Sequence, residues 1–432
     1  MNPRRGESAS HETSLRRELG TWSATWLGLG SILGTGVFVS LGLVAGLAGI
    51  WTAAAVVLAA LVAACNALSS AQLAAAHPRS GGTYEYGYEL LNPLAGFTAG
   101  WMFLCAKSAS GATAALGFAG YALNAAGVEA GGPRLWLAGA AVIALTVLVA
   151  GGLRRSNLTN TVIVSITLLA LCAFVVSGLP SAVRNWGALP KGLPSLSAFL
   201  EAVALMFVAY TGYGRVATLG EEVRDPRRTI PRAILSTLVV SAALYFAVAA
   251  VGVSAVGGAG LLRATEGQSA TLEIAARTFG VPGVAHLVAV GAITAMLGVL
   301  LNLLLGLSRV LLAMGRRGDM PHAVTRMREA NASPYAAVLV VGAVVLLLTL
   351  IGSVKTAWSF SAFTVLVYYA ITNVAALRLP PQRRFYPRLW SVGGLLGCLF
   401  LAFWVERPVW LAGCGVLAVG WLWHTAAARL SR

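Results

Sequence analysis

The stretch "GLGSILGTG" (residues 28–36) places four glycines among nine residues inside a long uncharged segment. Glycine is the weakest common helix former after proline, so its concentration in an apolar span needs a reason. Two explanations fit the residues. Gly30 and Gly34 match the small-xxx-small spacing that lets two membrane helices approach closely. Alternatively, the backbone stops being helical here, and its freed polar groups face a cavity or protein.

The surrounding composition indicates a polytopic membrane protein. The chain has 432 residues, of which 58% are hydrophobic and 11% charged, and its mean hydropathy is +0.78. Soluble domains carry about 25% charged residues. The net charge of +16 is spread over short loops, which argues against a nucleic-acid partner. The five cysteines show no metal or redox spacing, and no cofactor is expected.

Apolar segments of the length that a bilayer requires recur along the chain. We expect about 12 spans in an all-α fold, because a bilayer core needs about 20 apolar residues per helix. Their expected ranges are 19–46, 51–76, 90–123, 134–152, 157–179, 196–220, 231–256, 283–313, 335–353, 357–379, 387–404 and 408–427. Pro226 and Pro231 are expected to interrupt helix around the start of the seventh span.

The arginines and lysines between these spans predict an orientation. One set of alternate loops, together with both termini, carries about threefold more of them than the other set. Both termini are therefore expected in the cytoplasm, with the protein integral to the bacterial inner or plasma membrane.

The glycine-rich stretch has a counterpart five spans later. Residues 209–214, "AYTGYG", again place glycines at mid-span. If the first ten spans form two repeats of five, the odd number of spans in each repeat inserts the second repeat in the opposite orientation. Interrupted helices at matching positions of such inverted repeats mark the substrate site of secondary transporters. Exposed N–H groups near Thr35 and Gly36 would suit a carboxylate. Carbonyls of Ser31 or Ile32, and of residues 207–211, would suit an ammonium.

Several stretches resemble the amino acid–polyamine–organocation superfamily of transporters. They are "GSILGTGVF" (30–38), "SGGTYEYGYELLNPLAGFTAGW" (80–101), "FVAYTGYGRVATLGEEVRDPRRTIPRAI" (207–234) and "GLSRVLLAMGRRGDMP" (306–321). The resemblance runs along essentially the whole chain. It implies the LeuT-like inverted-repeat fold, alternating access, and an amino acid or amine as substrate.

This resemblance divides the chain and assigns roles to residues. The expected parts are a cytoplasmic tail (1–18), a first repeat (19–180), a second repeat (196–380), two further helices (386–427) and a C-terminal tail (428–432). By position, the N–H groups of Thr35 and Gly36 would bind the carboxylate. The carbonyls of Ile32, Val208 and Thr211 would face the amine, and Ser108 falls near a third-helix substrate position.

Three departures from the family pattern affect gating and coupling. Val208 occupies the place of an aromatic gate, so Phe207 or Tyr210 would take that role. Thr167 stands where some proton-coupled members carry a lysine. The Arg-Asp-Gly that usually follows the eighth helix is rearranged to "RRGD" (316–319).

Lys107 is the most informative single charge, because it lies mid-span in "FLCAKSASGATAA". Charges at that depth usually face a cavity or a partner. It could be a coupling group that exchanges a proton, a ligand for a carboxylate, or a structural lysine bonded to free carbonyls. Arg215 is expected to form a cytoplasmic gate contact or an ion pair near Glu221 and Glu222. Residues 265–279 are expected to form a short external lid helix with an apolar face.

The predicted site can now be stated as a set. The expected substrate-binding residues are Ser31, Ile32, Gly34, Thr35, Gly36, Lys107, Ser108, Phe207, Val208, Tyr210 and Thr211, and the expected coupling or gating residues are Lys107, Thr167 and Arg215. A proton or sodium ion is a possible co-substrate. An antiporter, a channel and a non-transporting sensor remain as alternatives, whereas clustered catalytic side chains that would suggest an enzyme are missing from the spans.

Overall fold

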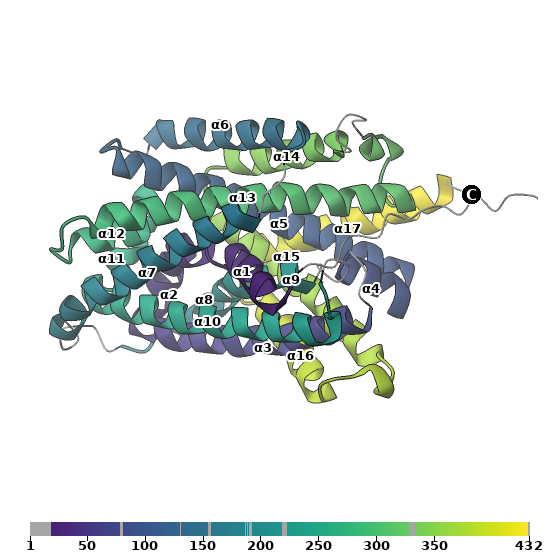
Figure 1. The fold of residues 1–432 in the computed structure, drawn as a ribbon, viewed down its shortest axis with the longest axis horizontal. Helices are drawn as coiled ribbons and strands as arrows, with labels where there is room; N and C mark the ends of the chain where they lie inside the picture. Colours follow the sequence, from purple (N-terminus) through teal and green to yellow (C-terminus); the bar gives the residue numbers. More distant parts are fainter. Residues whose placement is uncertain are drawn as a thin grey trace, which may run out of the picture.

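The computed structural model describes residues 19–77, 81–129, 131–153, 157–185, 187, 189, 192–217, 223–327 and 333–430. Regular structure among these residues is helical, apart from one isolated bridge between Leu19 and Val223. Most helices run roughly along the long axis of the molecule (Figure 1). The short helix α4 lies at one end of this bundle, and α11 and α12 lie at the other.

The elements follow one another as a series of long helices joined by short connections. Their bounds are α1 (Thr21–Ile32), η1 (Gly36–Ser40), α2 (Leu41–Ala48), η2 (Gly49–Trp51), α3 (Thr52–Ala76), α4 (Thr83–Leu90), α5 (Pro93–Ala125), α6 (Gly131–Ala150), α7 (Asn157–Asn185), α8 (Leu196–Tyr210), η4 (Thr211–Tyr213), α9 (Gly214–Ala217), α10 (Pro226–Val256), α11 (Gly258–Gln268), α12 (Thr271–Arg277), α13 (Val284–Arg317), η5 (His322–Thr325), α14 (Tyr335–Leu350), α15 (Val354–Arg378), η6 (Pro381–Arg383), α16 (Arg388–Ala402) and α17 (Arg407–Leu430).

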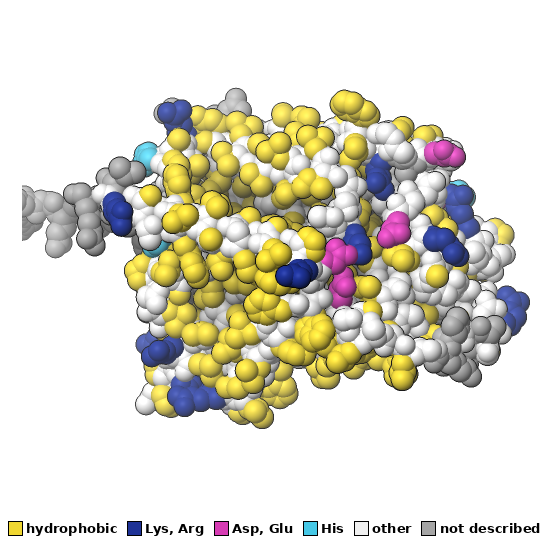
Figure 2. Space-filling model, turned by 180° about the vertical axis from the view of Figure 1, so that it is seen from behind, with side chains coloured by type: hydrophobic (Ala, Val, Ile, Leu, Met, Phe, Trp, Pro, Cys, Tyr) yellow, Lys and Arg dark blue, Asp and Glu magenta, His cyan; other side chains and the backbone are white. Residues whose placement is uncertain are grey.

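The predicted all-helical architecture is confirmed for the described residues, and each expected range overlaps one long helix or a run of shorter ones. The number of membrane crossings stays a prediction. Within the described residues, eight segments are long and apolar enough to cross a membrane, and the first of them, Thr21–Ala76, contains two expected spans. Two shorter apolar helices, α14 and α16, accompany them. Hydrophobic side chains cover most of the face seen in Figure 2. Charged side chains on it lie toward its two ends and in one group of both signs near its middle. The wide hydrophobic cover suits contact with a bilayer.

Side-chain caps and prolines explain where several helices begin. The Asn92 side chain accepts a hydrogen bond from the Ala95 N–H at 2.8 Å, and Pro93 opens α5. Ser195 caps α8 in the same way, through the Ala198 N–H at 3.2 Å. The expected interruption at Pro231 is wrong: α10 begins at Pro226 and continues through Pro231. Near a helix start, a missing N–H removes at most one intrahelical hydrogen bond.

The expected lid segment forms two helices instead of one. α11 ends at Gln268 and α12 begins at Thr271, because Ser269 between them adopts a left-handed conformation with φ of 56°. The predicted apolar face is confirmed: Leu272 and the alanines and phenylalanine that follow it at helical spacing are all buried.

Long helices around α5 form the centre of the bundle. α13 and α15 both pack along α5, while α10 packs along α3 and α7 packs against α13. The largest buried side chains include several tyrosines, among them Tyr121, Tyr210 and Tyr245. This central group of helices surrounds the two chain interruptions.

Candidate functional site

The first interruption is a true break in the helix. α1 ends at Ile32, and Leu33 takes an extended conformation with φ of −74° and ψ of 103°. The chain resumes as the π-helix η1, whose first turn begins at Gly36. The first N–H groups of a helix have no partner within it, so this restart presents backbone donors.

The second interruption is gentler. α8 ends at Tyr210, and a single tight turn, η4, leads into α9 without an extended residue. The predicted interruptions are therefore both present, but the second one frees fewer backbone groups than the first.

The two interruptions touch each other directly. A Cβ added to Gly36 would collide with Ala209, because it would lie 2.8 Å from the Cα of Ala209. A Cβ added to Gly212 would collide with the carbonyl oxygen of Ser31 and lie 2.7 Å from the Cγ1 of Ile32. Glycine at both places allows the two backbones to meet. The two explanations of the glycine-rich stretch, a helix break and close packing, thus both apply.

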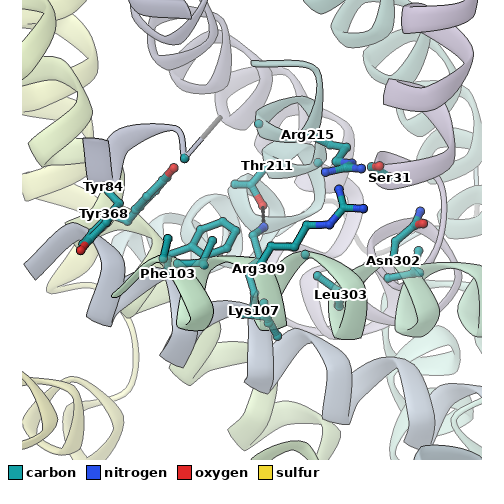
Figure 3. A pocket seen from close by; sticks show the side chains of 18 of the residues that line it. Ser31, Tyr84, Phe103, Lys107, Thr211, Arg215, Asn302, Leu303, Arg309 and Tyr368 are labelled. Atoms are coloured by element: carbon teal, nitrogen blue, oxygen red, sulfur yellow. Dashed lines mark hydrogen bonds between the residues drawn. The ribbon is translucent and has the colours of Figure 1, made fainter. Parts of the chain in front are cut away.

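A cavity of about 250 Å³ opens beside these breaks. It runs from Ser31 and Thr211 past Lys107 toward Tyr84 on α4, so it leads to the α4 end of the bundle. α5, η4, α9, α13 and α15 supply most of its wall (Figure 3).

A second, smaller cavity of about 40 Å³ lies directly at the breaks. The predicted residues that line it are Ser31, Ile32, Thr35, Gly36, Lys107, Val208 and Thr211. Thr35 is 4% exposed, and its Oγ1 has no hydrogen-bond partner among the described residues. A buried hydroxyl without a partner is costly, so this oxygen is available to a ligand.

Lys107 lies on the wall of both cavities. Its Nζ donates a hydrogen bond to Thr211 Oγ1 at 2.8 Å (Figure 3). The Thr211 hydroxyl in turn donates to the carbonyl of Val208 at 2.7 Å. An ammonium has three donors, so this bond leaves Lys107 with capacity for a ligand.

Two buried tyrosines contact carbonyls at the breaks. The Tyr245 hydroxyl lies 2.8 Å from the carbonyl oxygen of Ile32 and 3.4 Å from that of Ala209. The Tyr369 hydroxyl donates to the carbonyl of Thr211 at 3.2 Å. Each carbonyl has two lone pairs and can accept a second hydrogen bond from a ligand.

Five residues of the predicted set do not line either cavity: Gly34, Ser108, Thr167, Phe207 and Tyr210. Phe207 packs edge-on against Tyr369, and the Tyr210 hydroxyl donates to the carbonyl of Val56. Thr167 donates to the carbonyl of its own helix at Ile163. On α5, Ser110 reaches the smaller cavity instead of Ser108.

The structure adds wall residues that the sequence reasoning did not select. They include Asn302 and Arg309 on α13, Trp358 on α15, and the pair Tyr368 and Tyr369. Arg309 had a recognisable signal, because an arginine well inside an apolar span is costly unless it faces water or a partner. The aromatic residues had none, because a tyrosine or tryptophan at helical spacing is equally typical of a packed core.

Arg215 also lines the larger cavity. The glutamates near which it was expected to pair, Glu221 and Glu222, lie outside the described residues. The rearranged "RRGD" segment is visible at the α4 end. Asp319 accepts hydrogen bonds from Tyr84 at 2.6 Å and Tyr88 at 2.7 Å.

The end of the bundle opposite α4 is closed by hydrogen bonds centred on Tyr121. This fully buried side chain donates to the carbonyl of Phe38 at 2.7 Å and accepts from the N–H of Leu272 at 2.9 Å. It therefore joins α5 to η1 and α12. Trp358 closes the neighbouring wall, since its Nε1 donates to the carbonyl of Leu205 at 2.9 Å.

Replacing Tyr121 by phenylalanine is expected to loosen this closure. The change leaves the buried N–H of Leu272 without this acceptor, at about 1–3 kcal/mol, and removes the donor that Tyr121 offers to the carbonyl of Phe38. Hydrogen–deuterium exchange in α12 should accelerate. Tyr335→Phe is the matched control, because no hydrogen bond of the Tyr335 hydroxyl to a described residue is found. Equal exchange in the two variants would show that Tyr121 does not hold α12.

Interrupted apolar helices that meet beside a cavity are typical of one class, the multi-pass membrane transporters. The sequence model of the amino acid permease family matches residues 23–426. The chain belongs to this family.

Curated relatives agree with this assignment. An uncharacterized transporter of Mycobacterium tuberculosis is 42% identical over 94% of this chain and 90% of its own length. The branched-chain amino acid permease BcaP of Bacillus subtilis is 30% identical over 91% of this chain and 89% of its own. Cationic amino acid transporter 4 of Mus musculus is 31% identical over 86% of this chain and 61% of its own.

Proposed function

We propose that the protein is a secondary active transporter that carries an amino acid or a related amine across the bacterial cytoplasmic membrane by alternating access. The observation that carries this proposal is the direct contact of the α1 and α8 interruptions beside a cavity that leads to one end of the bundle. Family membership supports an amino acid as the substrate class.

The substrate's carboxylate would be held by the backbone N–H groups of Thr35 and Gly36 and by the free hydroxyl of Thr35. Its ammonium group would face the carbonyls of Ile32, Val208 and Thr211. Support comes from the smaller cavity, because these residues line it together. Helix starts favour anions through their donors and their dipole.

In the proposed topology the chain crosses the membrane about 12 times, in two inverted five-span repeats followed by two helices. The first repeat comprises residues 19–180 and the second residues 196–380. Both termini and α4 would be cytoplasmic, consistent with the excess of arginines in the corresponding loops. The cavity leads toward α4 while Tyr121 closes the opposite end, so the conformation would be inward-facing.

Coupling is proposed to be proton symport or exchange, with Lys107 as the titrating group. The hydroxyl of Thr167 does not titrate in the physiological pH range and therefore cannot be the coupling group. A lysine can exchange a proton, and Lys107 lines both cavities. An amino acid–polyamine antiporter is the alternative within the same class, and a channel-like or sensor protein is the alternative outside it.

Purified protein in liposomes tests the proposal. Uptake of a panel of labelled amino acids and amines would be followed with an imposed pH gradient, with a sodium gradient, or with internal substrate for exchange. We expect saturable uptake of at least one amino acid. An ion conductance without saturable uptake would favour a channel, and absence of both would contradict the transporter proposal.

A further inference from the structure

The charges that line the larger cavity share one sign. Lys107, Arg215 and Arg309 contribute cationic groups, and the described lining residues include neither aspartate nor glutamate. The three come from α5, α9 and α13, and Figure 3 shows their side chains around one common space.

No hydrogen bond or ion pair of Arg309 is found within the described part of the chain, and its side chain is exposed to the cavity. By contrast, Arg317, two turns further along α13, pairs with Glu85 at 2.6 Å. The guanidinium of Arg309 is thus available for a bidentate contact with a carboxylate.

The position of these cations relative to the breaks suggests which part of a substrate they meet. The smaller cavity lies at the breaks, where the residues proposed to hold the groups common to all amino acids line it together. Lys107 stands where that cavity meets the larger one, and Arg309 lies in the larger one. A side chain attached to a substrate bound at the breaks would therefore extend toward Lys107 and Arg309.

We propose that the transported amino acid carries a carboxylate in its own side chain, which Lys107 and Arg309 bind. This inference rests on the proposed function. A cationic side chain would meet like charges without a carboxylate among the described lining residues to offset them, and an aliphatic one would offer neither cation a counter-charge. The specificity would then differ from what the names of the Bacillus subtilis and Mus musculus relatives state.

The test compares acids with their amides, which have nearly the same shape. Uptake of glutamate, glutamine, aspartate, asparagine, arginine and leucine would be measured with purified protein in liposomes. We expect at least one acid to have a KM about 10- to 100-fold below that of its amide, the range of a charge-assisted hydrogen bond.

Variants assign the preference to the cavity. Arg309→Gln should raise the KM for the acid about 10-fold or more, while leaving that for the amide unchanged. Arg309→Lys keeps the charge and should retain the preference. Arg316→Gln is the matched control on the same helix, because Arg316 contacts Met327 instead of the cavity. Size-exclusion profiles and thermal unfolding verify that each variant is folded.

The outcomes separate this inference from the function on which it rests. Transport of leucine, arginine or the amides in preference to the acids would overturn the acidic substrate and leave amino acid transport standing. An equal rise in both KM values in Arg309→Gln would overturn the role of Arg309. Failure to transport any of these amino acids, or any compound of the wider panel of amino acids and amines, would overturn the proposed function itself.

Discussion

Gly212→Ala is expected to abolish substrate binding and transport while leaving a folded, membrane-inserted protein. The new methyl group would collide with the carbonyl oxygen of Ser31 and crowd Ile32, whose Cγ1 lies 2.7 Å from the Cβ position. The obstacle includes the backbone at the end of α1, so relief requires the two interruptions to separate. Overpacking of this kind costs about 1–3 kcal/mol in a well-packed interior.

Binding measured by thermal stabilisation with substrate, and uptake into liposomes, would report the loss. Gly415→Ala on α17 is the matched control, because no atom lies within 4 Å of its Cβ position. It should transport like the wild type. Wild-type binding by Gly212→Ala would show that contact between the two interruptions is not needed for the site.

Lys107→Met is expected to produce the second large effect, because it removes the cation common to both cavities while keeping an unbranched side chain that is one atom shorter. Loss of a charge-assisted hydrogen bond of about 1.5–3 kcal/mol corresponds to a 10- to 150-fold loss of affinity for a carboxylate ligand. Lys107→Arg keeps the charge and should retain part of the binding.

Two assays on Lys107→Met separate ligand binding from coupling. Exchange of labelled for unlabelled substrate needs no driving force, whereas accumulation needs the pH gradient. Normal exchange with lost accumulation would identify Lys107 as the coupling group, and loss of both would identify it as a substrate ligand. Full accumulation driven by the pH gradient would contradict both roles.

The interrupted helices could be predicted from the sequence because glycines cluster at mid-span in two places five spans apart, a recurrence that close packing of helices alone does not require. How far the backbone departs from helical geometry at each break could not be predicted from the sequence. Leu33 adopts an extended conformation while residues 211–213 keep a tight helical turn, and this difference depends on what packs around each segment.

Individual wall residues were harder to predict than the breaks. A helix presents each residue at a fixed angle, so Ser110 reaches the smaller cavity and Ser108, two positions away, does not. Phe207 and Tyr210 carry the aromatic groups expected of a gate, yet both pack into the core. Which face of a helix meets the cavity depends on the packing of α5, α8, α13 and α15 together, and periodicity in one segment does not contain that information.

The contact of Gly36 with Ala209 makes the space between the two interruptions a shared property of distant parts of the chain. A methyl group on residue 36 would collide with the Cβ of Ala209 and lie 2.8 Å from its Cα, so Ala209→Gly would remove the first collision and leave the second. Alanine at position 36 therefore requires the backbones of the two interruptions to move apart. In natural variants of this chain, position 36 should remain glycine whatever residue stands at position 209.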